Sequence, residues 1–209
     1  MLSINNVKLK WLGHASFKLE HNGLKIYIDP YQVKETDKAD IILITHGHYD
    51  HCSVEDIAKL TKEDTIIITT PDTTSKLASK VDGGKPQLIK PGDKLKLKGI
   101  MVEAVPAYNI NKQFHPKDNE WVGYVITINN VRFYHSGDSD AIPEMNNIKA
   151  DIAMLPVGGT YTMNAQEAAS VANKIKPKLA IPMHYGKIVG SNSDAERFKQ
   201  LCKCEVKIM

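Results

Sequence analysis

The sequence has 209 residues, 42% of them hydrophobic, which can supply one large core, and we expect a single domain over residues 1–209. Charged residues make up 24% and nearly cancel to a net charge of +3, which argues against nucleic-acid partners and anionic membrane surfaces. No apolar stretch approaches the roughly 20 residues that span a bilayer, and no secretory signal is evident, so we expect a soluble, cytoplasmic protein of undetermined oligomeric state.

Short strands are predicted at the start of the chain. Residues 7–12, 16–20 and 24–28 fit an antiparallel meander, with His21-Asn22-Gly23 as a hairpin turn. The apolar run 41–44 predicts a buried strand, and Ser53 is a candidate N-cap for a short helix through Leu60. A strand over 65–69 and a helix from Pro71 to about Ser79 complete a βαβα passage.

The second half of the chain repeats this alternation of strands and helices. Residues 86–128 are predicted as strands, one over 100–106, interrupted by Pro91-Gly92-Asp93 and by a long loop over 108–121. A hairpin of 122–128 with 131–135 is predicted, followed by strands 151–155, 179–183 and 205–208. Two helices are predicted between these strands: 164–175, capped by Asn164 and Glu167, and 193–202, capped by Ser193 and Glu196. Together they predict an α/β fold of two sheets between outer helices.

Four side chains that bind metals fall within six residues, directly after the strand 41–44. They are His46, His48, Asp50 and His51. Buried imidazoles and carboxylates need partners, and a divalent ion would satisfy them together. His46 and His48, two residues apart, project to the same side and can bind one ion, whereas Asp50 and His51 can reach a second.

Two further candidate ligands follow later strands. Asp138 comes after strand 131–135 and is a candidate bridge between two ions, and His184 comes after strand 179–183 as a candidate ligand of the second ion. A two-metal centre lowers the pKa of water to about 7 and polarises a carbonyl or phosphoryl oxygen. The sequence therefore predicts an enzyme, a metal-dependent hydrolase, in which Asp50 and Asp138 are the catalytic carboxylates.

These motifs resemble the metallo-β-lactamase fold superfamily. The resemblance rests on His46-x-His48-x-Asp50-His51, Gly137-Asp138, His184, and Asp29 in Tyr27-Ile28-Asp29-Pro30. Trp11-Leu12-Gly13-His14-Ala15-Ser16, Tyr134-His135-Ser136-Gly137-Asp138 and Pro182-Met183-His184-Tyr185 are similar to the branch of small metal-dependent hydrolases related to ascorbate-6-phosphate lactonase.

The resemblance implies a four-layer αββα sandwich, two mixed sheets flanked by helices, with a dinuclear site at one sheet edge. It assigns His46 and His48 to the first ion, places Asp138 between the ions, and assigns Asp50, His51 and His184 to the second ion. Asp29 would orient the histidine loop from outside the ligand set, and His14 is a candidate for a similar role. Zinc is the expected metal, and manganese or iron also suits such ligands.

One position departs from the family pattern. The strand that usually supplies a third histidine to the first ion ends here in Ala107-Tyr108-Asn109, and the nearest histidine, His115, lies in the long loop. Either His115 folds back to complete the site, or Asn109, Tyr108 or water takes the position. Cys52, beside His51, is either a buried thiol or a neighbour of the metal site.

The substrate is predicted only as a class: a small ester, lactone or phosphorylated molecule. Residues on loops at the same end of the strands are candidates for substrate contact: Tyr108, Asn109, Tyr161, Tyr185 and Lys187. Two alternatives remain open, a metal or ligand sensor without turnover and a nucleic-acid phosphodiesterase of the same superfamily.

Overall fold

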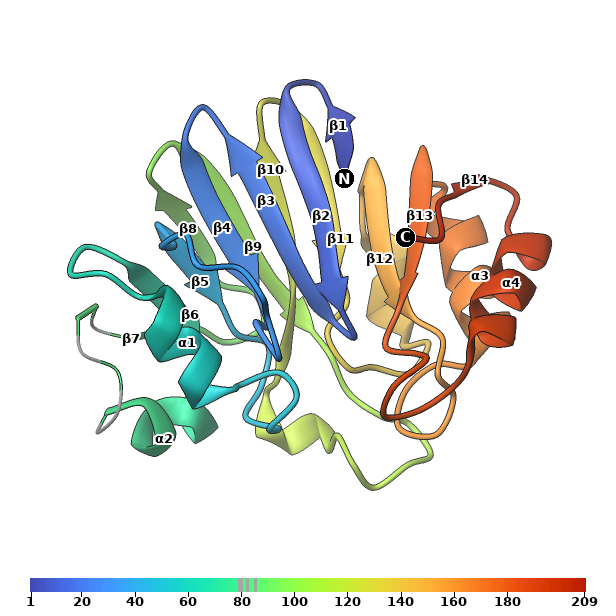
Figure 1. The fold of residues 1–209 in the computed structure, drawn as a ribbon. Coiled ribbons are helices and arrows are strands. Elements are labelled where there is room, and N and C mark those ends of the chain that lie inside the picture. The colour runs from blue at the N-terminus through green and yellow to red at the C-terminus, as the bar shows by residue number, and fades with distance from the viewer. Residues whose placement is uncertain (79–80, 82, 85) are drawn as a thin grey trace. The chain divides into compact units, whose positions relative to one another are not determined.

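The computed structural model of the chain describes residues 1–78, 81, 83–84 and 86–209. These residues group into two compact units, Met1–Ile89 and Lys90–Met209. Each unit contains one mixed β-sheet together with helices (Figure 1).

The sheet of the first unit has its strands in sequence order. In the described residues they are β1 (Leu2–Ile4), β2 (Val7–Gly13), β3 (Ser16–His21), β4 (Leu24–Ile28), β5 (Ile41–Leu43), β6 (Ile66–Thr69) and β7 (Pro86–Leu88). Neighbours from β1 to β4 are antiparallel, and neighbours from β4 to β7 are parallel. Asn22 and Gly23 have φ angles of 49° and 83°, which confirms the hairpin turn.

Helices of the first unit pack on the parallel part of this sheet. α1 (Val54–Leu60) begins where predicted, because the Ser53 side chain accepts a hydrogen bond from the Asp56 N–H. The next helix starts as a 3-10 turn, η1 (Pro71–Thr73), and continues as α2 (Thr74–Ala78), while the predicted end at Ser79 lies outside the described residues. Buried residues of α1, α2, β4, β5 and β6 form one apolar cluster, which includes Ile57, Leu77, Tyr27, Ile42 and Ile67.

The sheet of the second unit repeats the arrangement of the first. Its described strands are β8 (Lys94–Leu97), β9 (Ile100–Pro106), β10 (Val122–Ile128), β11 (Val131–His135), β12 (Ile152–Pro156), β13 (Leu179–Met183) and β14 (Glu205–Val206). Neighbours are antiparallel from β8 to β11 and parallel from β11 to β14. The two sheets thus share one topology although the sequence contains no evident repeat.

In the second unit, one short helix follows β9 and the others follow β11, β12 and β13. They are η2 (Lys117–Asn119), η3 (Pro143–Asn147), α3 (Ala165–Ile175) and α4 (Asn192–Leu201). α3 packs against β12 and α4 against β13, and the two helices pack against each other (Figure 1). The Asn164–Glu167 capping box of α3 is confirmed.

The predicted cap of α4 was wrong. Ser191, rather than Ser193, precedes the helix, and the Asp194 carboxylate, rather than Glu196, accepts a hydrogen bond from the Ser191 N–H at 2.7 Å. Both serines stand three residues before an acidic residue, so the sequence pattern alone did not separate them. The earlier pair starts the helix sooner, directly after Gly190, whose φ angle of 64° turns the chain.

The predicted fold class, two mixed sheets flanked by helices, is confirmed. In each unit the strands that run in one direction end at a common sheet edge. These strands are β2, β4, β5 and β6 in the first unit and β9, β11, β12 and β13 in the second. The predicted site residues follow the ends of these strands. No helix in the described part of the chain has the length and apolar character needed to cross a bilayer.

Candidate metal centre

Asp29 anchors the histidine loop of the first unit. It follows β4, is fully buried, and accepts hydrogen bonds from the Thr45 N–H at 2.8 Å and the Thr45 hydroxyl at 2.7 Å. Its Oδ2 atom also lies 2.7 Å from His51 Nδ1. A hydrogen on Nδ1 that is donated to this oxygen leaves the lone pair on Nε2, the kind of atom through which an imidazole can bind a metal.

His14, which follows β2, contacts Asp50 of the histidine loop. Its Nε2 atom is 2.9 Å from Asp50 Oδ2, and the Trp11 indole N–H donates to the His14 carbonyl at 2.8 Å. Ligand atoms of His14, Asp50 and His51 all lie within 4.8 Å of one another. His14 therefore fixes one oxygen of the Asp50 carboxylate.

His46 and His48 form a close imidazole pair. Nε2 of His46 is 3.0 Å from Nδ1 of His48, and Nδ1 of His46 is 3.0 Å from the Thr45 hydroxyl oxygen. The two rings meet edge to face with their centroids 4.6 Å apart. The expectation that both side chains project to one side is confirmed by this contact.

Asp138, His115 and His184 form a second cluster, which lies in the second unit. The Nε2 atom of His184 is 3.1 Å from Asp138 Oδ2, and the Nε2 atom of His115 is 3.3 Å from the same oxygen. All three side chains are buried. The long loop therefore does fold back and bring His115 to Asp138.

Asn109 holds His115 in this orientation. The Asn109 amide oxygen is 3.1 Å from the His115 N–H and 3.0 Å from His115 Nδ1, and the Tyr161 carbonyl is 3.2 Å from Nδ1. Two acceptors at Nδ1 place the hydrogen there and leave the lone pair on Nε2, which faces Asp138. The sequence left His115, or else Asn109, Tyr108 or water, at this position; the structure places His115 beside Asp138, with Asn109 as a hydrogen-bond partner of His115.

Replacing Asn109 by alanine tests this role. We expect Asn109→Ala to weaken metal binding about 10- to 100-fold, as is typical when a partner of a metal-bound histidine is removed. Competition with a chelator measures the change. Gln113→Ala, an exposed position in the same loop, is the control and should keep the wild-type affinity. Equal affinities for Asn109→Ala and wild type would contradict the role.

The remaining predicted substrate residues lie in differing environments. Tyr108 is buried, and its hydroxyl donates to both carboxylate oxygens of Glu144, at 3.1 and 2.9 Å. Tyr185 is buried as well, and this burial raises the pKa of its phenol. Tyr161 is half-buried and Lys187 is exposed. Tyr161 and Lys187 are thus the members of this group with solvent access at their side chains.

Cys52 is a buried thiol. Its exposed fraction is 4%, and it belongs to the apolar cluster of the first unit. Burial raises the pKa of the thiol to about 12, so the reactive thiolate is scarce at neutral pH. We therefore assign Cys52 to packing.

Two residues outside the predicted set contact the histidine loop. Asp72 on η1 accepts a hydrogen bond from the Gly47 N–H at 2.8 Å, and the Lys76 ammonium on α2 donates to the Gly47 carbonyl. A sequence signal existed, because Asp72 follows the end of β6, the parallel neighbour of β5. Strand ends at one edge of a sheet are where functional side chains collect in α/β folds.

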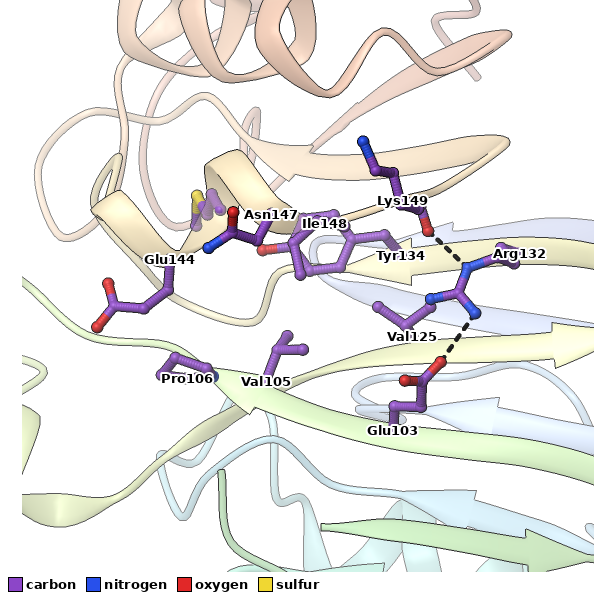
Figure 2. A pocket seen from close by; sticks show the side chains of 11 residues that line it. Glu103, Val105, Pro106, Val125, Arg132, Tyr134, Glu144, Asn147, Ile148 and Lys149 are labelled. Carbon is purple, nitrogen blue, oxygen red and sulfur yellow. Dashed lines mark hydrogen bonds and ion pairs between the residues drawn. The ribbon is translucent and has the colours of Figure 1, made fainter. Parts of the chain in front are cut away.

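The second unit also contains a pocket of about 270 Å³ that is separate from the His/Asp clusters. Figure 2 shows Arg132 between Glu103, at 2.9 Å, and the Lys149 carbonyl, at 2.7 Å, with Tyr134 in the pocket wall. Its lining includes none of the predicted metal or substrate residues. The His/Asp clusters, and not this pocket, therefore contain the predicted metal ligands.

The donor atoms fit a divalent metal. On a tetrahedral zinc ion with Zn–N bonds near 2.0–2.1 Å, two ligand atoms are about 3.3 Å apart. The separations between atoms of predicted ligands are 3.0, 3.1 and 3.3 Å for three pairs and 3.8 Å for Asp50 with His51, so they lie on both sides of this value. The chain therefore contains buried His/Asp clusters able to bind metal.

Comparison with known proteins places the chain in a family. Residues 8–184 match the family described as the β-lactamase superfamily domain. A UPF0173 metal-dependent hydrolase of Thermoplasma acidophilum is 36% identical over 211 residues, covering 95% of this chain and 92% of the relative.

Solved structures agree with this match. A Parabacteroides distasonis protein described as a metal-dependent hydrolase has a TM-score of 0.86 and 34% identity, covering 97% of this chain and 92% of that one. The metallo-β-lactamase fold protein YhfI of Bacillus subtilis has a TM-score of 0.76 at 14% identity, over 94% and 89% of the two chains, and shares the fold alone.

The fold and the His/Asp clusters thus define a protein of the metallo-β-lactamase fold class. The chain belongs to the UPF0173 metal-dependent hydrolases within the β-lactamase superfamily. It is a metal-dependent hydrolase, and both the predicted superfamily and the predicted enzyme class are confirmed.

Proposed function

We propose that the chain hydrolyses a small ester or lactone with a water molecule activated by two divalent ions, zinc being the first candidate. In this proposal the two units form one domain. His46, His48 and His115 bind the first ion, and Asp50, His51 and His184 bind the second, with Asp138 between them. The observation that carries the proposal is the approach of two imidazole Nε2 atoms, from His115 and His184, to one oxygen of Asp138.

The surroundings of the ligands support metal binding by these residues. Three proposed ligands have a fixed partner: Nδ1 of His51 contacts Asp29, Nδ1 of His115 contacts Asn109, and the Asp50 carboxylate contacts His14. Such partners set the tautomer and orientation of a ligand before the metal binds. This pre-organisation favours a resident cofactor.

The chemistry follows from the proposed ligand set. Divalent ions supply a hydroxide nucleophile at neutral pH and offset negative charge in the transition state. The proposed roles of Asp50 and Asp138 are to place the attacking water and to hold its proton. The buried setting of both carboxylates strengthens these electrostatic effects.

Charges on the loop that carries His115 favour an ester or lactone over a phosphorylated substrate. Lys112 makes an ion pair with Asp140, and Lys117 lies 3.3 Å from Glu144 and 4.6 Å from the centre of the Tyr108 ring. Both lysine charges therefore already have an acidic partner. A phosphoryl group would have to compete with these carboxylates.

Apolar side chains on the same loop favour a hydrophobic substituent on the substrate. Ile110 and Phe114 lie in the loop that leads to His115, and they are 54% and 47% exposed. The Phe114 ring lies edge to face with the Tyr161 ring, with their centroids 4.7 Å apart. Exposed apolar groups beside a polar cluster are typical of a ligand-binding surface.

The proposal also includes a cellular location and a class of partner. Cys52, Cys202 and Cys204 are free thiols, as is usual in a reducing compartment, and we propose a cytoplasmic location. A small molecule is the proposed partner, and neither nucleic acid nor a membrane is part of the proposal.

Metal content and turnover test the proposal together. The metal-free protein is reconstituted with zinc, manganese or iron, and bound metal is measured by elemental analysis. We expect about two equivalents to bind and ester cleavage to depend on them. Less than one equivalent with each metal, together with no cleavage, would reject the proposal. Tight metal binding without turnover would instead favour a sensor.

The substrate class is tested with a matched series. We expect kcat/KM for 4-nitrophenyl esters to rise from acetate to butyrate, and bis(4-nitrophenyl) phosphate to be cleaved more slowly than either. Phe114→Ala should remove the preference for butyrate, worth about tenfold for two buried methylene groups. A faster reaction with the phosphodiester would show that the substrate class is wrong.

A further inference from the structure

Gly47 lies between His46 and His48, and side chains of η1 and α2 bind both of its backbone polar groups. Its N–H donates to Asp72 Oδ2 at 2.8 Å, and its carbonyl accepts a hydrogen bond from the Lys76 ammonium. The residue that joins the two imidazoles is thus held from outside the histidine loop.

Asp72 is itself fixed before it meets the loop. The Thr70 hydroxyl donates to Asp72 Oδ1 at 2.6 Å, so each carboxylate oxygen has its own donor. Lys76 follows Asp72 by four residues, which places the carboxylate and the ammonium on one side of the η1–α2 segment. The two groups therefore reach the same peptide unit.

The contact explains why the middle residue of the motif is glycine. A Cβ atom at position 47 would overlap Asp72 Oδ2 and would lie 3.3 Å from Lys76 Nζ. The backbone of Gly47 does not adopt a positive φ angle, so conformational freedom is not the reason. Close approach to the Asp72 carboxylate is what requires the missing side chain.

We propose that Asp72 and Lys76 are positioning residues that set the separation and orientation of the His46 and His48 imidazoles. Because they fix the peptide between the two histidines, they hold the 3.0 Å spacing of the imidazole nitrogens. Pre-organised ligands bind metal more tightly, since less conformational freedom is lost on binding. This inference rests on the proposed function, in which His46 and His48 share an ion.

The test compares metal affinity with the stability of the metal-free protein, using the full chain. Zinc affinity is measured by competition with a chelator for wild type, Asp72→Ala and Lys76→Ala, and the visible spectrum of the cobalt-substituted protein reports ligand geometry. We expect the dissociation constant to rise about 10- to 100-fold in both variants, with an altered cobalt spectrum. Their metal-free melting temperatures should stay close to that of wild type.

Two further variants serve as matched comparisons. Lys76→Arg keeps a charged N–H donor for the Gly47 carbonyl, so this variant should retain most of the metal affinity of wild type. Ser75→Ala, an exposed residue of α2 between the two positions, should match wild type in affinity and in melting temperature.

The outcomes separate this inference from the function on which it rests. If wild type binds no metal, the proposed function fails. If wild type binds metal and both alanine variants bind it equally well, the positioning role fails. An equal loss of affinity in Ser75→Ala, or a loss matched by a large fall in metal-free melting temperature, would also overturn it. Should Asp72→Ala fail to fold, Lys76→Ala decides by the same readouts.

Discussion

Replacing Asp138 by alanine is expected to lower kcat/KM on the order of a thousandfold, the largest effect of any single change proposed for this chain. Both His115 Nε2 and His184 Nε2 approach the oxygen that this change removes. The proposed bridge between two ions is lost, so we also expect bound metal to fall from about two equivalents to one or less. Steady-state kinetics and elemental analysis measure the two effects.

Asp118→Ala is the control for this prediction. Asp118 is exposed on η2 in the same unit and lies outside the His/Asp clusters. Its removal should leave both metal content and turnover at the wild-type level. Asp138→Ala with two bound equivalents and near-normal turnover would show that Asp138 is not a ligand.

Replacing Asp29 by alanine is expected to destabilise the fold as well as the site. Asp29 is fully buried and accepts from the Thr45 N–H, the Thr45 hydroxyl and His51 Nδ1. Each buried donor left without an acceptor costs roughly 1 kcal/mol or more, so we expect the free energy of unfolding to fall by about 3 kcal/mol. Urea denaturation of the metal-free protein measures this change.

Asp29→Asn separates loss of shape from loss of charge. Asparagine fits the φ angle of 44° at this position and keeps one acceptor oxygen. Its NH2 group, however, replaces the second oxygen and would meet the donors that this oxygen accepts from in wild type. We expect an intermediate loss of stability and a weaker metal affinity than wild type. An unfolding free energy equal to that of wild type in Asp29→Ala would contradict the anchoring role.

The position of the histidine loop could be predicted because it depends on local pattern. An apolar run marks β5, and the polar ligands must come directly after it, where the strand ends. The support given by Asp72 and Lys76 depends instead on which strand lies beside β5 and where the next helix begins. Pairing of β5 with β6 involves contacts far apart in the sequence, which a local pattern does not contain.

The role of His115 was open for the same reason. A strand that ends in Tyr108-Asn109 left both the histidine and the asparagine as candidates. The loop closes through a reciprocal contact, in which the Asn109 N–H donates to the His115 carbonyl at 2.7 Å and the Asn109 side chain binds the histidine ring. Such a closure depends on side-chain geometry, and neither residue type nor spacing specifies it.

Element ends were predicted best where a turn residue or a cap is unambiguous. β10 and β11 match their predicted bounds because Asn129 and Asn130 form the tight turn between them, with φ angles of 47° and 63°. β1 was missed, since three residues carry too little pattern to be recognised and their strand depends on pairing with β2. Tertiary pairing, more than propensity, decided this element.

Three residues with proposed chemical roles have backbones in the left-handed region: His14, Asp29 and His184, with φ angles of 51°, 44° and 58°. Glycine or asparagine would adopt this conformation with less strain. At His14 and His184, selection for stability alone would therefore favour replacement, whereas Asp29 is retained by the buried donors that it satisfies. A relative that has lost catalysis should drift toward glycine or asparagine at positions 14 and 184, so these two positions distinguish active from inactive members of the family by sequence.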